Sequence, residues 1–302
     1  MPLAAISLMM KHAATGRYAV GYFESWNLES MQGVIDAAEL SASPIIVGFN
    51  GAFLAGQRAA PERLELYAAF GRAAAESASV PCGLIFNECP RDDWVKKAIE
   101  AGFNLVMLAD PAASYGDYVA RVAAITRLAH ARGVAVEGEL GELPCGAAAD
   151  GGPPEGGTST DPAVAAEFVA ATGVDLLAVS VGNVHIQTRG ESNLDLGLLE
   201  EINARVPLPL VLHGGTGISA ESLRAAVALG VAKVNFGTYL KQRYLTAVRK
   251  ALGSDCLDPH RLLGMGGADD VSMAGRLAVR DAVLERIELL GCCGKAGIGG
   301  DQ

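Results

Sequence analysis

The sequence predicts an α/β protein of the (β/α)8 or TIM barrel class, with a helical extension at its C-terminal end. Short runs rich in Val, Ile and Leu alternate eight times with longer amphipathic stretches. Continuously apolar runs are typical of parallel strands that helices cover, and eightfold alternation is the pattern of a closed barrel. We therefore expect a single domain over residues 1–302, with the barrel over about 18–253 and the extension over about 254–302.

The expected strands and helices follow directly from this alternation. Asp161-Pro162 is typical of a helix start, and Gly133, Gly173 and Gly230 stand where left-handed helix ends are expected. The strands are expected at 18–25, 44–50, 80–88, 104–110, 134–140, 176–182, 208–214 and 232–238. The helices are expected at 28–41, 62–78, 91–102, 114–132, 162–172, 195–205, 219–230, 239–252 and about 270–290.

Two segments fall outside the alternation. Residues 141–159 are rich in Gly, Pro and Ala and are expected to form a long loop without structure of its own. This loop is interpreted either as an active-site lid or as a disordered insertion. The Gly-rich tail, 291–302, is expected to fray.

Composition excludes several classes of partner. The net charge is −10 and no Lys/Arg cluster interrupts it, so we expect neither nucleic acid nor an anionic membrane as a partner. There is no apolar run long enough to span a bilayer and no pattern of a secretory signal, so the expected location is cytoplasmic. The six cysteines are scattered without a CxxC motif, which favours free thiols.

Three side chains at strand ends have the chemistry of a metal site. His185 and His213 end the sixth and seventh expected strands, and Glu88 ends the third. The carboxyl ends of barrel strands share one rim, so these groups can converge on a divalent ion, with zinc, manganese, iron and cobalt all compatible. A lone histidine at a strand end is more often a polar plug, and that alternative stays open.

A glycine-rich turn after the seventh strand predicts a phosphate site. Gly214, Gly215 and Thr216 precede a helix expected near Ser219, and Asn235 and Thr238 follow one strand later. Glycines allow backbone amides to approach an anion, and the last two loops of a barrel are the usual phosphate position. Glycine also serves ordinary tight turns, which is the alternative reading.

At this point the sequence resembles the class II, metal-dependent ketose-bisphosphate aldolases, the fructose- and tagatose-bisphosphate aldolase group. The resemblance extends from about residue 18 to 296 and rests on AVGYFESWNLESMQGVIDAAE, SPIIVGFNGA, AIEAGFNLVM, GVAVEGELGEL, TDPAVAAEFVAATGVDLLAVSVGNVH, LVLHGGTGI, KVNFGT and GCCGKA. It implies a TIM barrel, a homodimer or homotetramer, a small phosphorylated substrate, and a divalent ion, zinc most often, that polarises a ketose carbonyl.

The resemblance also assigns roles to individual residues. His185 and His213 match two metal-binding histidines, and Glu139 matches the strand-five glutamate of an ELG motif. The implied phosphate and substrate positions are Asn50, Gly182, Gly214, Gly215, Thr216, Asn235, Gly237 and Thr238.

Several positions depart from the family pattern. The third-strand motif His-x-Asp-His reads Ile85-Phe86-Asn87-Glu88, so Asn87 replaces the proton-transferring acid and Glu88 replaces a metal-binding histidine. Gly237 stands where the eighth strand carries an Asp, and Glu24 stands at the first-strand Asn-Val-Asn-Asn motif. Asn50 replaces a small Ser. Loss of the acid at Gly237 is expected to widen the pocket or free a backbone amide.

These departures define the functional hypotheses. The first is a metal-dependent aldolase for a phosphorylated ketose or related keto compound that cleaves fructose 1,6-bisphosphate poorly. Its candidate catalytic residues are Asn87 for orientation, and Glu139 and Glu24, with Glu155 of the long loop as a further candidate proton carrier. The alternatives are a phosphate-ligand-binding barrel without aldolase activity, such as a sensor, and a sugar-phosphate isomerase or epimerase.

Overall fold

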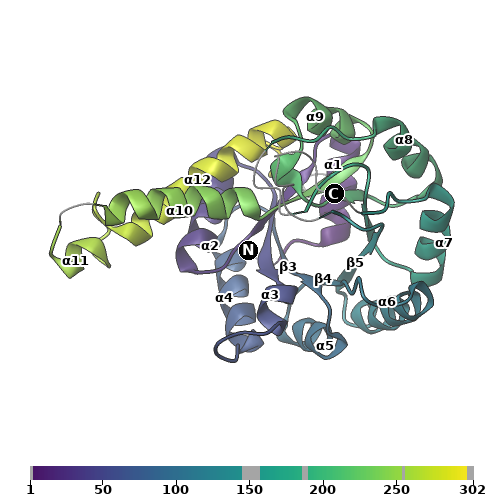
Figure 1. Cartoon of the computed structure of the whole chain (residues 1–302), viewed down its shortest axis with the longest axis horizontal. Helices are drawn as coiled ribbons and strands as arrows, with labels where there is room; N and C mark the ends of the chain where they lie inside the picture. Colours follow the sequence, from purple (N-terminus) through teal and green to yellow (C-terminus); the bar gives the residue numbers. More distant parts are fainter. Residues whose placement is uncertain (1–2, 145–156, 186–189, 254–255, 298–302) are drawn as a thin grey trace.

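The computed structural model describes residues 3–144, 157–185, 190–253 and 256–297 and contains a closed eight-stranded barrel (Figure 1). Each strand is parallel to the next, and β8 pairs with β1 to close the ring. The strands are β1 (Val20–Glu24), β2 (Ile45–Asn50), β3 (Cys82–Cys89), β4 (Leu105–Leu108), β5 (Ala135–Leu140), β6 (Leu176–Val179), β7 (Leu210–Leu212) and β8 (Val231–Phe236). The predicted TIM barrel is therefore confirmed.

Helices surround the barrel, and several begin at the residues that favour capping. Asp161 accepts hydrogen bonds from the amides of Ala163 and Val164, with Pro162 at the first helical position. The helices that follow strands are α2 (Leu28–Ser41), α3 (Gly51–Ala55), α4 (Leu64–Ser77), α5 (Asp92–Ala101), α6 (Tyr115–His130), α7 (Pro162–Thr172), α8 (Leu196–Arg205), α9 (Ala220–Ala228) and α10 (Thr238–Leu252). A short 3₁₀ turn, Gly215–Gly217, follows β7.

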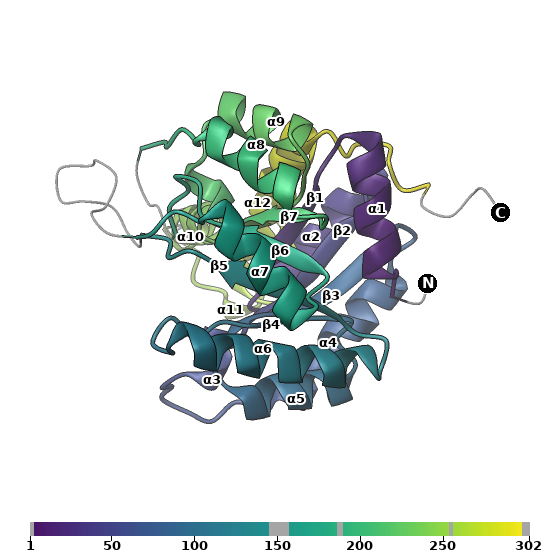
Figure 2. The ribbon, with the colours of Figure 1, turned by 90° about the vertical axis from the view of Figure 1, so that its right-hand side faces the viewer.

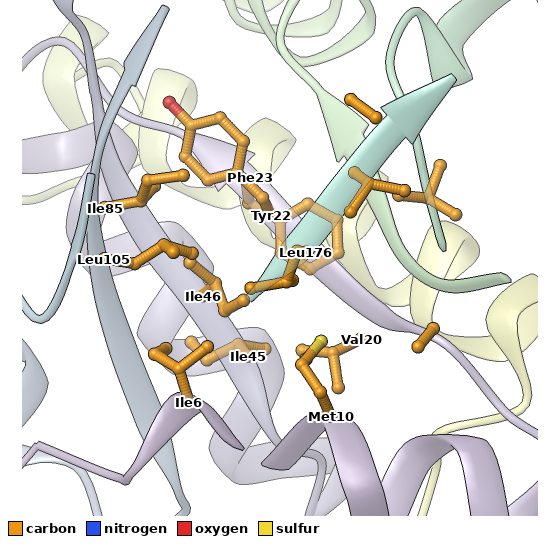
Figure 3. Packing of buried hydrophobic residues seen from close by; sticks show 14 of the residues in the cluster. Ile6, Met10, Val20, Tyr22, Phe23, Ile45, Ile46, Ile85, Leu105 and Leu176 are labelled. Atoms are coloured by element: carbon orange, nitrogen blue, oxygen red, sulfur yellow. The ribbon is translucent and has the colours of Figure 1, made fainter. Parts of the chain in front are cut away.

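An N-terminal helix, α1 (Ile6–Gly16), covers the end of the barrel at which the strands begin (Figure 2). Its buried Ile6 and Met10 lie beside Val20 and Ile45 at the base of the core (Figure 3). The Asn104 amide donates to the carbonyl of Ala4 at 2.8 Å and fastens the start of this helix. Because one end of the barrel is closed in this way, the strand carboxyl ends form the end that a ligand can reach.

The C-terminal extension forms an arm beside the barrel. α10 and α12 (Val271–Leu290) lie side by side and project away from the strands, with α11 (Pro259–Leu262) at the tip (Figure 1). α12 also packs against α2, where the Arg276 guanidinium binds the Asp36 carboxylate at 2.6 and 2.8 Å.

Some sequence-based boundaries need correction. The helix α1 and the short α3 were not predicted, and β6 and β7 end at Val179 and Leu212, before the expected ends. Residues 141–159 were expected to lack structure, but Glu142 and Thr158 form an antiparallel bridge with two backbone hydrogen bonds. Residues 145–156, between those ends, lie outside the described residues. Within the described ranges, each helix is too short or too polar to cross a bilayer.

Candidate active site

A distortion at the end of β3 directs two successive side chains to the open end of the barrel. Side chains of a regular strand alternate between its faces, so Asn87 and Glu88 would normally point apart. Pairing of β3 with β4 is irregular between Phe86 and Cys89, and Glu88 has a left-handed φ of 52°. Such a conformation is uncommon outside glycine and is often found at functional sites. Here the Asn87 amide donates to Glu88 Oε1 at 2.8 Å.

Glu88 contacts side chains at or after the ends of three other strands, β2, β6 and β7. Asn50, which caps α3, donates from Nδ2 to Glu88 Oε2 at 2.9 Å. His185 Nε2 lies 3.5 Å from Glu88 Oε2, and His213 Nδ1 lies 3.2 Å from Glu88 Oε1. Glu139 Oε1 is also 3.2 Å from His213 Nδ1. The structure thus brings together the three predicted metal-binding side chains and adds Glu139.

A buried chain of charged groups supports His213 from the other side. His213 Nε2 is 2.8 Å from Glu137 Oε1, and Glu137 Oε2 is 2.8 Å from the ammonium of Lys233. Lys233 also donates to Asn235 Oδ1 at 2.6 Å. Glu137 and Lys233 are both 0% exposed, so their charges compensate one another in the barrel interior.

The local charges shift the pKa values of this cluster. Burial favours a raised pKa at Glu88, but hydrogen bonds from His185 and His213 and their charge hold the Glu88 pKa well below its usual range. Burial lowers the pKa of His213, yet the charge of Glu139 and hydrogen bonds to Glu137, Glu139 and Glu88 raise it well above 6.5. Burial lowers the pKa of Lys233, with Glu137 opposing the shift. Glu88 is therefore ionised at neutral pH, and its negative charge favours a cation at this point.

The side chains at this point are of the types that bind divalent ions. Glu137 accepts a hydrogen bond from Nε2 of His213, so Nε2 would keep its proton when the ring binds a metal, and Nδ1 is the nitrogen that would present a lone pair. That Nδ1 is buried and lies 3.2 Å from both Glu88 Oε1 and Glu139 Oε1. A carboxylate that fixes the far nitrogen of a ligating histidine is the usual surrounding of a protein metal ligand. Among the described residues, no three His, Cys, Asp or Glu side chains are already spaced as a complete ligand set.

Two cavities open on either side of Glu88 and His185. The first cavity, about 430 Å³, lies over the ends of β1, β2 and β8 and includes Glu24, Thr216, Thr238 and Lys241 in its wall. The second cavity, also about 430 Å³, lies over the ends of β4 and β5. Ala52, Glu88 and His185 belong to both walls. Glu88 and His185 can therefore act on a ligand that extends into both spaces.

Only part of the predicted phosphate segment lines the first cavity. Gly214, Thr216, Asn235, Gly237 and Thr238 do so, next to the N-terminus of α10. The Thr216 hydroxyl accepts a hydrogen bond from the amide of Tyr239 at 3.1 Å, which joins the loops after β7 and β8.

Two other glycines assigned to phosphate loops lie outside the cavity walls. A Cβ at Gly215 would approach Val234 to 2.7 Å, and a Cβ at Gly182 would approach the carbonyl of Asn193 to 3.1 Å. Gly215 therefore permits close packing, and Gly182 adopts a φ of 96° that favours glycine. The phosphate role of these two residues stays a prediction.

Comparison with known proteins identifies the family. The model of the family "Fructose-bisphosphate aldolase class-II" matches residues 4–295. The chain belongs to the class-II fructose-bisphosphate aldolase family. A fructose-bisphosphate aldolase of Geobacillus stearothermophilus is 34% identical over 301 residues, 98% of this chain and 99% of that protein. One of Staphylococcus epidermidis is 32% identical over 301 residues, 98% of this chain and 100% of that protein.

A solved structure of an aldolase supports the same conclusion at the level of the fold. The crystal structure of the YdjI aldolase of Escherichia coli K12 superposes with a TM-score of 0.80 at 31% identity. The match covers 97% of this chain and 99% of that one. The resemblance inferred from the sequence motifs is therefore confirmed.

Two departures from the class-II aldolase pattern prove to be coupled. A Cβ at Gly237 would lie 2.2 Å from Glu24 Oε2, so the Glu24 carboxylate occupies the space above this glycine. Lys241 Nζ holds Glu24 at 2.5 Å. A wider pocket at Gly237 is not found, because the Glu24 carboxylate from β1 fills the space above this glycine, and the alternative of a freed backbone amide stays a prediction.

Sequence reasoning gave no role to three residues of this site. Glu137 is evident on the fifth strand with Glu139, and the alternation in Glu137-Gly138-Glu139 signals that both glutamates share one strand face. Lys233 reads as part of an apolar strand. Lys241 lies one turn into α10 and could have been found from its proximity to Thr238 on a helix. Glu155, a candidate proton carrier, lies outside the described residues.

Proposed function

We propose that the protein is a metal-dependent aldolase that cleaves a carbon–carbon bond in a phosphorylated ketose or related keto compound. The observation that carries the proposal is the convergence of Glu88, Glu139, His185 and His213 between two cavities at the open end of the barrel. We further propose that fructose 1,6-bisphosphate is cleaved very poorly, because Asn87 stands where the family pattern has its acid.

Glu88, His185 and His213 are the residues proposed to hold the metal, with Glu139 next to them. Imidazole and carboxylate ligands suit zinc best, and manganese, iron or cobalt would also fit. A bound divalent ion supplies Lewis-acid polarisation of a ketose carbonyl. Glu137 orients His213 for this role and Asn50 orients Glu88.

The first cavity is proposed to bind the phosphorylated end of the substrate. The first turn of α10 forms part of this wall, and a helix N-terminus favours an anion. The hydroxyls of Thr216 and Thr238 and the ammonium of Lys241 lie in the same wall. These groups position the ketose so that its carbonyl faces Glu88 and His185.

Proton transfer in this site requires carboxylates other than residue 87. An amide donates or accepts hydrogen bonds but does not titrate near neutrality, so Asn87 orients Glu88 and the substrate only. Cleavage removes a proton from a substrate hydroxyl as the aldehyde forms. The carbon of the other fragment, at which the C–C bond broke, then takes up a proton. We assign the first transfer to Glu139, which lines the second cavity, and the second to Glu24, which lines the first. Burial raises the pKa of Glu24, with Lys241 opposing the shift, which favours a carboxyl able to carry a proton.

A cleavage panel tests the proposal directly. Purified protein is supplied with zinc or manganese and assayed for aldehyde release from phosphorylated ketoses, including fructose 1,6-bisphosphate. We expect metal-dependent cleavage of at least one ketose phosphate and little cleavage of the bisphosphate. Binding without any cleavage would favour a sensor, and conversion without aldehyde release would favour an isomerase or epimerase.

The double variant Asn87→Asp/Glu88→His tests why fructose 1,6-bisphosphate is a poor substrate. It restores an acid that can carry a proton, and such a group contributes on the order of 10²-fold or more to rate. We therefore expect kcat for this bisphosphate to rise by about that factor in the presence of zinc. Efficient cleavage by the unmodified protein would contradict the role given to Asn87.

Phosphate binding is tested at Thr216. Thr216→Val removes the hydroxyl that joins the two loops, and we expect inorganic phosphate to bind about 1–3 kcal/mol more weakly in calorimetry. Thr216→Ser keeps the hydroxyl and serves as the control. Equal affinity in all three proteins would place the phosphate elsewhere.

We also propose that the enzyme acts in the cytoplasm as a homodimer or homotetramer. Exposed apolar side chains on and around the α10–α12 arm support assembly, namely Leu245, Leu252, Leu257, Leu263 and Met265.

A further inference from the structure

The second cavity differs from the first in the charge of its walls. Asp110, Glu139 and Glu142 line it, together with Glu88 at its base. Among the residues that the structure describes, no lysine or arginine forms part of this wall. The first cavity, in contrast, contains Lys241 and the N-terminus of α10.

The arginine near the second cavity, Arg121, already forms ion pairs with two carboxylates. Arg121 binds Asp110 at 2.7 Å and Asp92 at 2.7 Å, and it donates to the carbonyl of Pro90 at 3.1 Å. Its guanidinium therefore links Asp110 to Asp92 and Pro90, and these carboxylates neutralise most of its positive charge. A phosphate group placed in the outer part of this cavity would face Asp110 and Glu142, and no lysine or arginine of the described wall would compensate its charge there, which is electrostatically unfavourable.

The remaining wall of the second cavity is apolar and aromatic. Tyr115, Tyr118, Leu140 and Leu143 contribute to it. The Tyr118 ring is stacked on Phe168 at 5.7 Å, and its hydroxyl donates to the carbonyl of Leu108, so this part of the wall is rigid. Carboxylates accept hydrogen bonds from hydroxyl groups, and apolar surfaces contact the C–H faces of a carbon chain. An uncharged polyhydroxylated chain satisfies both parts of the wall.

We propose that the second cavity receives the half of the substrate that leaves as the aldehyde, and that this half carries no phosphate. The inference rests on the proposed aldolase function and specifies its substrate class: a ketose monophosphate whose single phosphate occupies the first cavity. In cleavage, the hydroxyl of the second half loses its proton to Glu139 and becomes the aldehyde carbonyl as the C–C bond breaks. The bond electrons stay on the phosphorylated half, whose carbon then takes a proton from Glu24. The step needs no oxidant or reductant.

The reverse reaction provides a matched pair of probes. The metal-supplemented protein is given dihydroxyacetone phosphate with either glyceraldehyde or glyceraldehyde 3-phosphate, which differ by the phosphate group. We expect kcat/KM to favour glyceraldehyde by at least about tenfold, since like charges repel the ester from the second cavity. A preference for the ester would overturn the inference. Condensation with neither aldehyde, nor with other uncharged hydroxyaldehydes, would contradict the proposed function itself.

A charge-reversal variant tests the wall itself. Glu142→Lys places a cation in the second cavity, and we expect the ratio of the two kcat/KM values to shift toward the phosphate ester by about tenfold or more. Glu200→Lys makes the same change of net charge at an exposed position on α8 and should keep the wild-type ratio. Equal ratios in all three proteins would show that the wall does not select against phosphate.

Phosphate stoichiometry gives a measurement that does not depend on turnover. Titration with inorganic phosphate in a calorimeter should reveal one binding site in the wild-type protein, in the first cavity. Two sites of similar affinity would overturn the inference while leaving aldolase activity possible. One site combined with cleavage of no ketose phosphate would instead contradict the proposed function.

Discussion

The buried carboxylate of Glu137 binds a charged or polar side chain with each of its two oxygens. It lies between His213 and Lys233, and all three side chains are at most 1% exposed. A buried ion pair adds little stability by itself, but removal of one partner leaves an uncompensated charge in the interior. Glu137 therefore links the stability of the barrel core to the orientation of His213.

Glu137→Gln should destabilise the protein by about 3–5 kcal/mol, because it leaves the ammonium of Lys233 without a counter-charge. The double variant Glu137→Gln/Lys233→Met removes both charges and should recover at least about half of the loss. Urea unfolding at pH 7 measures both values. If the double variant is less stable than the single one, charge compensation is not the role of this pair.

Gly237 and Glu24 form a second pair that functions together. Gly237→Ala would place a methyl group 2.2 Å from Glu24 Oε2, so we expect a cost of about 1–3 kcal/mol from overpacking. Adding Glu24→Ala should reduce that cost, which a double-mutant cycle measured by thermal or urea unfolding will show. Gly116→Ala, where a Cβ meets nothing within 4 Å, is the control and should be close to neutral. Additive effects of the two substitutions would contradict the coupling.

At the scale of elements, the C-terminal arm depends on close contacts and one cap. A Cβ at Gly275 would lie 2.3 Å from the Tyr244 ring, and a Cβ at Gly33 would lie 2.5 Å from the carbonyl of Arg276. These two glycines allow α12 to approach both α10 and α2. At the start of α12, Asp270 accepts hydrogen bonds from the amides of Gly264, Gly266, Ser272 and Met273.

Asp270→Ala should destabilise the arm by about 1–2 kcal/mol, the usual range for loss of an N-cap. Asp270→Asn should cost less because it keeps an oxygen acceptor. Asp258→Ala, at the N-cap of the four-residue α11, is the matched control and should change stability little. Hydrogen exchange of the α11–α12 amides will show whether the loss is local to the arm.

The cap also predicts a pH dependence. The backbone amides, that of Gly266 foremost, lower the pKa of Asp270, so the folded state prefers the ionised carboxylate. Its contribution is present above the unfolded pKa of about 3.9 and is lost as the pH falls through the lower folded pKa. The stability difference between wild type and Asp270→Ala should therefore be constant from about pH 5 to 8 and narrow below about pH 4. A difference that widens in acid would contradict this sign.

At the scale of the whole molecule, the arm projects from one side of the closed barrel (Figure 1), and several of its apolar side chains are exposed. Leu257 is 95% exposed and Leu263 is 60% exposed. Large apolar side chains that are this exposed are candidates for an interface where they gather in one patch. The open end of the barrel lies apart from the tip of the arm, so assembly through the tip leaves both cavities accessible.

We expect a homodimer or homotetramer in light scattering at micromolar concentration. Leu257→Glu/Leu263→Glu should shift the protein to a smaller species, because charges at an interface core oppose association. The circular dichroism spectrum should stay unchanged. A wild-type monomer, or a variant that assembles normally, would show that the arm tip is not the contact.

The sequence by itself determined the barrel, the family and the rim at which the site lies. Eight apolar runs require helices on their outer faces, and parallel strands bring their carboxyl ends together. The order of the strands alone therefore predicts that Glu88, His185 and His213 meet, and the residue type at Asn87 alone marks a departure from the family pattern.

Only the tertiary structure shows in which direction these side chains point and which opposite charges pair with them. Strand alternation would separate Asn87 from Glu88, and only the left-handed conformation at Glu88 turns both to the site. The pairing of Lys233 with Glu137, and of Glu24 with the space over Gly237, joins residues far apart in the chain. Contacts of this kind depend on strand register and on a local irregularity of the backbone, which residue types alone do not predict. Hydrophobic periodicity and strand order, in contrast, can be inferred directly from the sequence.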